Sequence, residues 1–121
     1  QNIRAIIDVG SNSVKLLVAE VADGVVTPLV HEGEQTRLGQ GVFETGQLAS
    51  EAIEATARVV ADFAAKAKEQ GVALGLVPIA NGNLFEFSHE LFVMNGKNTR
   101  LNPVLRHCIK ELSYFISESQ K

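Results

Sequence analysis

The sequence predicts an α/β fold, with α+β as the alternative, in the order β-β-β-α-β followed by one or two helices. Three short stretches near the N-terminus have the apolar patterns of strands in a covered sheet. A later stretch, residues 50–70, repeats its apolar residues at the spacing of one helix face. The chain has 121 residues, 45% of them hydrophobic, so we expect one domain around one core.

The first three strands are expected to form a meander. Residues 3–9 alternate with a period of two, and residues 14–21 are almost continuously apolar. Small, turn-forming residues separate them at 10–12, and a second turn leads to the third strand, residues 25–32. Because Pro28 cannot donate to a ladder, we expect this third strand at a sheet edge or interrupted there.

The middle of the chain predicts a loop, a helix and a fourth strand. Residues 33–47 are rich in glycine and lack lasting periodicity, which indicates a loop. Ser50 occupies an N-cap position and Gly71 stands where a left-handed cap can end a helix, which predicts a helix over about residues 50–70. Residues 72–79 are short and apolar, and we expect the fourth strand there, with a bend near its end.

The composition of the chain changes near residue 80. Residues 1–80 contain thirteen alanines, whereas residues 81–121 contain none and hold five of the seven asparagines. We therefore distinguish a segment 1–80 from a segment 81–121, and expect the second to pack on the same core as the first. A chimera, a junction across omitted residues and a divergent C-terminal half would each explain the change, and all three remain open.

The second segment predicts an amphipathic helix from Asn102, an N-cap, and Pro103, a first-turn proline, to the end of the chain. Residues 84–94 are apolar enough for the core but fit either a helix or a strand, and Asn95-Gly96 fits a turn. The stripe of the terminal helix is wide and comprises Val104, Leu105, Cys108, Ile109, Leu112, Phe115 and Ile116.

The width of this stripe predicts a homodimer. We expect the helix over residues 50–70 to cover one face of the sheet and the terminal helix to cover the other. One face of a small sheet would leave part of the stripe bare, so a symmetric pairing through the helix 103–118 is expected to bury the remainder. Packing as a monomer is the alternative.

Charge and composition argue against several functional classes. The net charge of −3 has mixed signs without a run of like charge, so we expect neither a nucleic-acid nor a membrane partner. The chain lacks a membrane-spanning apolar run and a signal-peptide pattern, and is expected to be cytoplasmic. Cys108 is expected to be a small buried apolar residue, and His31, His89 and His107 lack metal-site spacing.

Three linked blocks resemble one known family. Residues 5–13, Ala-Ile-Ile-Asp-Val-Gly-Ser-Asn-Ser, resemble the first phosphate loop of the exopolyphosphatase / guanosine pentaphosphate phosphatase family. Residues 36–41 and 46–53 resemble the family's sequence before and into its first helix, at the expected distance from the loop. The resemblance covers residues 3–72, whereas residues 81–121 match no part of the family that we recognise.

The resemblance implies a ribonuclease-H-like, actin-like ATPase half-lobe, hydrolysis of terminal phosphates from polyphosphate or guanosine pentaphosphate, and a magnesium requirement. The loop itself suits phosphate, because a tight glycine turn directs backbone N–H groups into a concavity. The predicted phosphate-binding residues are Gly10, Ser11, Asn12 and Ser13. Asp8, at the end of the first strand, is the predicted magnesium ligand, since hard cations prefer carboxylate oxygens. An ordinary hairpin with a capping aspartate is the alternative.

Other motifs of the family are missing. Its threonine- and arginine-containing motif after the fourth strand is replaced by residues 79–83, Ile-Ala-Asn-Gly-Asn, and no arginine follows until Arg100. No segment matches its catalytic glutamate motif or its second phosphate loop, so no catalytic residue is predicted, and Glu86 and Glu90 are interpreted as a solvated pair on one helix face. We therefore expect a fragment or chimera of a phosphohydrolase that binds phosphate or polyphosphate weakly and is inactive alone. The alternative is a non-catalytic, self-associating unit.

Overall fold

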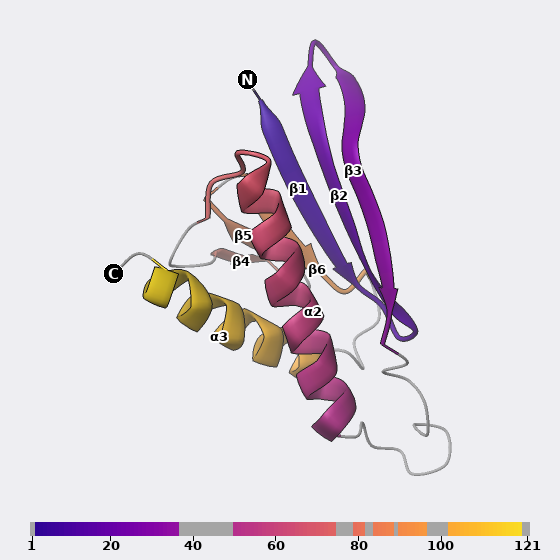
Figure 1. The fold of residues 1–121 in the computed structure, drawn as a ribbon, viewed down its shortest axis with the longest axis vertical. Helices are drawn as coiled ribbons and strands as arrows, with labels where there is room; N and C mark the ends of the chain where they lie inside the picture. The colour runs from indigo at the N-terminus through magenta and orange to yellow at the C-terminus, as the bar shows by residue number, and fades with distance from the viewer. Residues whose placement is uncertain are drawn as a thin grey trace.

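A computed structural model describes residues 2–36, 50–74, 79–81, 84–88, 90–96 and 102–119. Within them the elements follow the order β-β-β-α-β-β-β-α (Figure 1). The bounds are β1 Ile3–Val9, β2 Ser13–Ala22, β3 Val25–Gln35, α2 Ser50–Glu69, β4 Ile79–Asn81, β5 Leu84–Phe87, β6 Leu91–Met94 and α3 Asn102–Ser119.

The strands form one mixed sheet in the order β3-β2-β1-β6-β5-β4. The first three strands are an antiparallel meander, and β4, β5 and β6 form a second antiparallel unit. The two units meet where β6 pairs in parallel with β1, from Ala5 opposite Leu91 to Asp8 opposite Met94. The fold is therefore α/β, as the sequence predicts, with β1 in the interior of the sheet.

The meander forms as expected from its apolar pattern. Ala5, Ile7 and Val9 are each 0% exposed, while the residues between them face the opposite side and are exposed. The β2–β3 turn uses Asp23 and Gly24, both at positive φ, which suits a two-residue hairpin. The third strand lies at the sheet edge, as Pro28 predicted, and a register shift opposite Val18 and Ala19 interrupts its pairing.

Helix α2 matches the predicted helix to within one residue. It ends before Gly71, whose φ of 96° is the left-handed conformation expected of a helix cap. Thr56 carries the buried hydroxyl of this helix within the described residues. This hydroxyl donates to the Ala52 carbonyl at 2.8 Å, so its hydrogen-bonding need is met inside the fold. At the other side of the helix Lys66 forms a 2.7 Å salt bridge to Glu32 of β3.

Two predicted boundaries are wrong. The expected loop 33–47 begins too early, because residues 33–35 still pair with β2, and residues 37–49 lie outside the described part of the chain. The expected fourth strand 72–79 is not a strand over 72–74, and residues 75–78 lie outside the description. The described part of β4, Ile79–Asn81, pairs with β5.

Residues 84–94, which fitted either a helix or a strand, form the hairpin of β5 and β6. Two strands that the predicted order of elements did not include therefore lie between the fourth strand and the terminal helix. These residues form strands because the edge of β1 that faces away from β2 needs backbone hydrogen-bond partners. At this edge the Ala5 N–H donates to the Glu90 carbonyl at 2.8 Å. Glu86 and Glu90 consequently share no helix face, and the Glu90 carboxylate accepts the Ala73 N–H at 2.9 Å.

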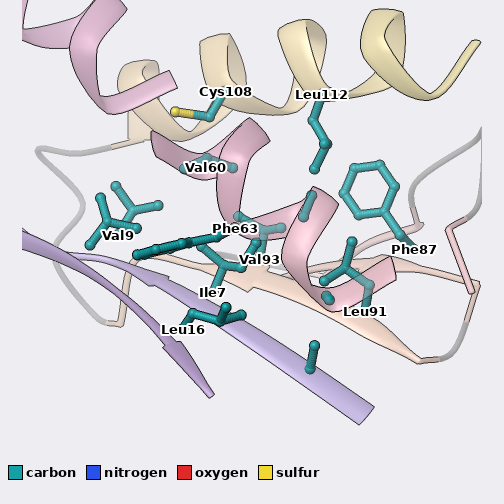
Figure 2. Close-up of a cluster of buried hydrophobic side chains, with 14 of the residues drawn as sticks. Ile7, Val9, Leu16, Val60, Phe63, Phe87, Leu91, Val93, Cys108 and Leu112 are labelled. Carbon is teal, nitrogen blue, oxygen red and sulfur yellow. The ribbon is translucent and has the colours of Figure 1, made fainter. Parts of the chain in front are cut away.

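Both described helices lie on the same face of the sheet (Figure 1), so the expectation that α3 covers the face opposite α2 is wrong. Figure 2 shows Cys108 and Leu112 of α3 beside Val60 and Phe63 of α2, above Ile7 of the sheet. Helix α2 packs on β1 and β2, and α3 packs against α2 on the same side, where Figure 2 shows its Leu112 beside Phe87 of β5.

This arrangement buries the stripe of α3 inside one chain. Its apolar residues reach at most 7% exposure, so the reason for expecting a dimer through helix 103–118 does not hold for them. The residues concerned are Val104, Leu105, Cys108, Ile109, Leu112 and Ile116, while the side chain of Phe115 lies outside the description. Cys108 is the small buried residue that was predicted, and burial raises the pKa of its thiol to about 12. None of the described helices has the length and apolarity needed to cross a membrane.

The packing of α3 can be tested with two variants on the same helix. Leu112 is 1% exposed, so Leu112→Ala should lower the free energy of unfolding by about 2 to 5 kcal/mol through lost burial and a cavity. Tyr114 is 67% exposed, and Tyr114→Ala should change it by less than about 0.5 kcal/mol. Urea unfolding followed by circular dichroism measures both, and equal midpoints would show that α3 is not docked.

Candidate functional site

The predicted phosphate loop is the connection between β1 and β2, and the structure places all four of its predicted residues in one tight turn. Val9 pairs with Val14, and the Gly10 N–H donates to the Ser13 carbonyl at 2.9 Å, which closes the turn. Ser11 and Asn12 form its exposed tip. The N–H of Gly10 is therefore used by the hairpin, and it is not a donor for a ligand as the sequence suggested.

The first residue of the turn must be glycine for a steric reason. A Cβ at Gly10 would lie 2.9 Å from the Ser13 carbonyl oxygen, closer than real Cβ atoms come to such a group. The obstructing atom belongs to the backbone and cannot rotate away. The same atom accepts the bond that closes the turn, so the closure and the absence of a side chain depend on each other.

Donors for an anion remain at the tip of the turn. The N–H groups of Ser11 and Asn12 donate to no backbone carbonyl among the described residues, and the Ser11 side chain is exposed. The Asn12 carbonyl accepts the Thr36 N–H at 3.0 Å, which ties the tip to the end of β3. Two neighbouring amides with a nearby hydroxyl can bind one phosphate oxygen or two without a basic side chain.

Asp8 lies two residues before the turn, on the sheet face that carries no described helix. Its register partners are Lys15 on β2 and Met94 on β6, and its side chain is exposed. It forms no salt bridge with another described residue, and no cluster of three metal-binding side chains occurs in the described part of the chain. One free carboxylate fits magnesium when phosphate oxygens and water supply the other ligands, which is how magnesium is commonly held.

Two polar residues that the sequence analysis did not assign to the site also lie at this end of the sheet. Thr36 follows β3 and Asn95 follows β6, and each carries a buried side-chain oxygen without a hydrogen-bond partner among the described residues. Asn95 was interpreted as part of a turn because glycine follows it. Its position beside the turn depends on β6 lying next to β1, and the sequence carried no local signal for that pairing.

The two described histidines, His31 and His107, lie away from this turn. His107 of α3 has its Nε2 atom 2.9 Å from a Glu54 oxygen of α2, so it links the two helices. His31 is exposed on β3, while His89 lies outside the described residues. A groove between α2 and α3, lined by Glu54, Arg58, Glu111 and Tyr114 among others, has mixed charge and no ligand-like arrangement of donors.

Comparison with known proteins identifies relatives for part of this chain. No family model matches it. Exopolyphosphatase 2 of two Mycobacterium tuberculosis strains is 42% identical over 64 residues, which are 50% of this chain and 20% of the relative. The chain therefore matches about a fifth of the length of these curated relatives.

Solved structures give the same result. A Ppx/GppA family member from Aquifex aeolicus is 37% identical with a TM-score of 0.55, covering 59% of this chain and 23% of the other. Its type II variant is 35% identical with a TM-score of 0.56, covering 59% and 24%. A Cytophaga hutchinsonii exopolyphosphatase covers 92% of this chain and 32% of its own, with a TM-score of 0.64, but at 17% identity this likeness concerns the fold alone.

These matches agree with the motifs around the β1–β2 turn and with the topology of the sheet. The likeness of fold extends beyond residue 80, since 92% of the chain is covered, while the sequence likeness covers about half of it. About half of this chain is thus similar in sequence and fold to a segment of proteins of the exopolyphosphatase / guanosine pentaphosphate phosphatase family.

Proposed function

We propose that this chain is a phosphate-binding unit derived from an exopolyphosphatase-type phosphohydrolase, a fragment or chimera that is inactive alone. The observation that carries the proposal is the β1–β2 turn, whose tip residues Ser11 and Asn12 are exposed and donate their N–H groups to no backbone carbonyl among the described residues. The named relatives are exopolyphosphatases, so the ligand we propose is phosphate or the terminal group of polyphosphate.

Asp8 adds the magnesium half of this proposal. Magnesium bound by the exposed carboxylate of Asp8 and by phosphate oxygens would neutralise the charge of the anion. The chain's own residues would position the phosphate at the turn and orient it through the amides of the tip. A water nucleophile would still need a general base, and none of the family's base motif is present.

We also propose that segments 1–80 and 81–121 form one domain that works in the cytoplasm. The support is that β6 and α3, both from the second segment, pack against β1 and α2 of the first. A single buried free cysteine accords with a reducing compartment. The change in composition at residue 80 supports a chimera, and a divergent half would produce the same packing.

Phosphate binding is tested at the turn itself. Added phosphate should shift the amide resonances of Ser11 and Asn12, with an affinity in the tens of millimolar or tighter, about −2 to −3 kcal/mol or better. Gly10→Ala should abolish the shifts, because its Cβ meets the Ser13 carbonyl. Gly33→Ala is the matched control, since its Cβ meets the nearest atoms at 3.9 Å. Unmoved amides in the unmodified chain would exclude the site.

Hydrolysis is tested separately from binding. The purified chain with magnesium should release no phosphate from polyphosphate or guanosine pentaphosphate above the rate of a Gly10→Ala sample prepared in parallel. The reason is that no segment of the chain matches the family's catalytic glutamate motif or its threonine- and arginine-containing motif. Released phosphate is measured colorimetrically over hours. Turnover that follows the folded chain through two purification steps would contradict the loss of catalysis.

Self-association is a second candidate function, favoured by the face of the sheet that carries no described helix. Ile6, in the interior strand β1, is 40% exposed there, and its register partners Leu17 and Phe92 extend the apolar row. Arg4 lies two residues before Ile6 and Asp8 two residues after it, each about 7 Å from Ile6 along the strand. A two-fold axis through Ile6 places Arg4 of each copy opposite Asp8 of the other, which is a self-complementary arrangement.

A charge swap tests this pairing. Arg4→Asp should lower the apparent mass in sedimentation at high micromolar concentration, because two acidic residues then face each other across the axis. The double variant with Asp8→Arg as well should restore association, since it exchanges the partners without changing the net charge of the pair. A monomeric unmodified chain at that concentration would rule out this candidate function.

A further inference from the structure

Asn95 holds a buried oxygen that the fold leaves without a partner. The residue is 3% exposed, and its Nδ2 group donates to Oδ1 of Asn102 at 2.6 Å. Its own Oδ1 meets no hydrogen-bond donor among the described residues. Leaving a buried acceptor unpaired costs free energy that nothing in the described fold returns, and such atoms in native proteins commonly mark a ligand or water position.

The sheet places the Asn95 residue beside the phosphate loop. The parallel register that sets Asp8 opposite Met94 puts Asn95 next to Val9, which is one residue before Gly10. Neighbouring strands lie about 4.8 Å apart. Asn95 therefore stands at the carboxyl ends of two parallel strands, the place where open α/β sheets bind their ligands.

Two further observations point to the same end of the sheet. The buried hydroxyl of Thr36 is also unpaired among the described residues, and the Thr36 N–H is bonded to Asn12 of the loop. Helix α3, 18 residues long, begins at Asn102, the hydrogen-bond partner of Asn95. The partial positive charge of that helix end favours an anion near the Asn95 side chain.

The hydrogen-bonding groups of the turn and of Asn95 together define the ligand. The amides at the tip of the turn donate, so they require an acceptor such as a phosphate oxygen. The amide oxygen of Asn95 accepts, so it requires a donor. A phosphate that retains one proton, as HPO₄²⁻ or as a terminal P–OH group, offers both on a single tetrahedral ion. Sulfate has the same shape and charge as HPO₄²⁻ and offers acceptors alone.

We infer that Asn95 is a further binding residue of the loop, accepting a hydrogen bond from the P–OH group of a protonated phosphate so that the site selects phosphate over sulfate. This inference rests on the proposed phosphate-binding function. It assigns to residues 81–121 a part in the site, because β6 carries the selecting group to the loop of the first segment. No covalent step is involved.

The unmodified chain provides the first test. Phosphate and sodium sulfate are titrated separately, at equal ionic strength in mildly alkaline buffer where phosphate is mainly HPO₄²⁻, and the Ser11 and Asn12 amide shifts are followed. Phosphate should bind about three- to tenfold more tightly than sulfate, the effect of one added hydrogen bond. Equal affinities would overturn the role of Asn95 and leave the loop as a general anion site. Absence of binding by both anions would overturn the proposed function as well.

Three variants distinguish a role of Asn95 in selecting the anion from a purely structural role. Asn95→Leu keeps the approximate volume without the oxygen, and it should bind both anions with the affinity that the unmodified chain has for sulfate. Asn102→Ala breaks the same amide pair but leaves the Asn95 oxygen, so its preference for phosphate should persist. Thr36→Val should weaken the binding of phosphate and of sulfate to the same extent, because a hydroxyl can donate or accept a hydrogen bond. Equal loss of preference in Asn95→Leu and Asn102→Ala would show a structural role and overturn the inference.

Discussion

The fold depends on the parallel pairing of β1 with β6. Strand β1 lies inside the sheet, with both edges bonded, and its inward residues Ala5, Ile7 and Val9 are completely buried. Removing each larger side chain from water contributes about 1.5 to 3 kcal/mol, but this burial requires cover over the whole inner face. Without β6 the backbone of β1 would have an open edge, and the core shared with α2 and α3 would lose Leu91 and Val93. The contact between the two segments is therefore the condition for a single core.

The same pairing connects the fold to the site. Strand β1 ends directly in the turn that carries the donors of Ser11 and Asn12, and the Gly10 bond to Ser13 continues the strand hydrogen bonding into that turn. A turn closed in this way holds its tip amides in one orientation without the help of a ligand. Such preorganisation reduces the entropy lost when a small anion binds. The proposed site would therefore depend on the hydrogen bonds of the β1–β2 hairpin.

Sequence reasoning succeeded where the signal was local and failed where it depended on distant partners. The meander, the edge position given by Pro28 and the helix ending at Gly71 all follow from turn chemistry and periodicity within a few residues. The strands of residues 84–94 could not be separated from a helix, because Phe87, Leu91 and Val93 satisfy either period in so short a run. Their state is decided by the free edge of β1, more than seventy residues earlier in the chain. The side of the sheet on which α3 lies is decided in the same way, by its packing against α2.

The same distinction between local and long-range signals applies to the residues of the candidate site. The turn residues and Asp8 could be identified from one contiguous motif, although the use of the Gly10 N–H within the hairpin required the structure. Asn95 could not be identified, since an asparagine before a glycine is a common turn signal and its burial follows from long-range pairing. If β6 served only to complete the core, an apolar or solvent-exposed residue would be expected after it, because an unpaired buried amide oxygen lowers stability. Instead β6 is followed by Asn95, which carries such an oxygen next to the loop, and this favours a site shared by the two segments.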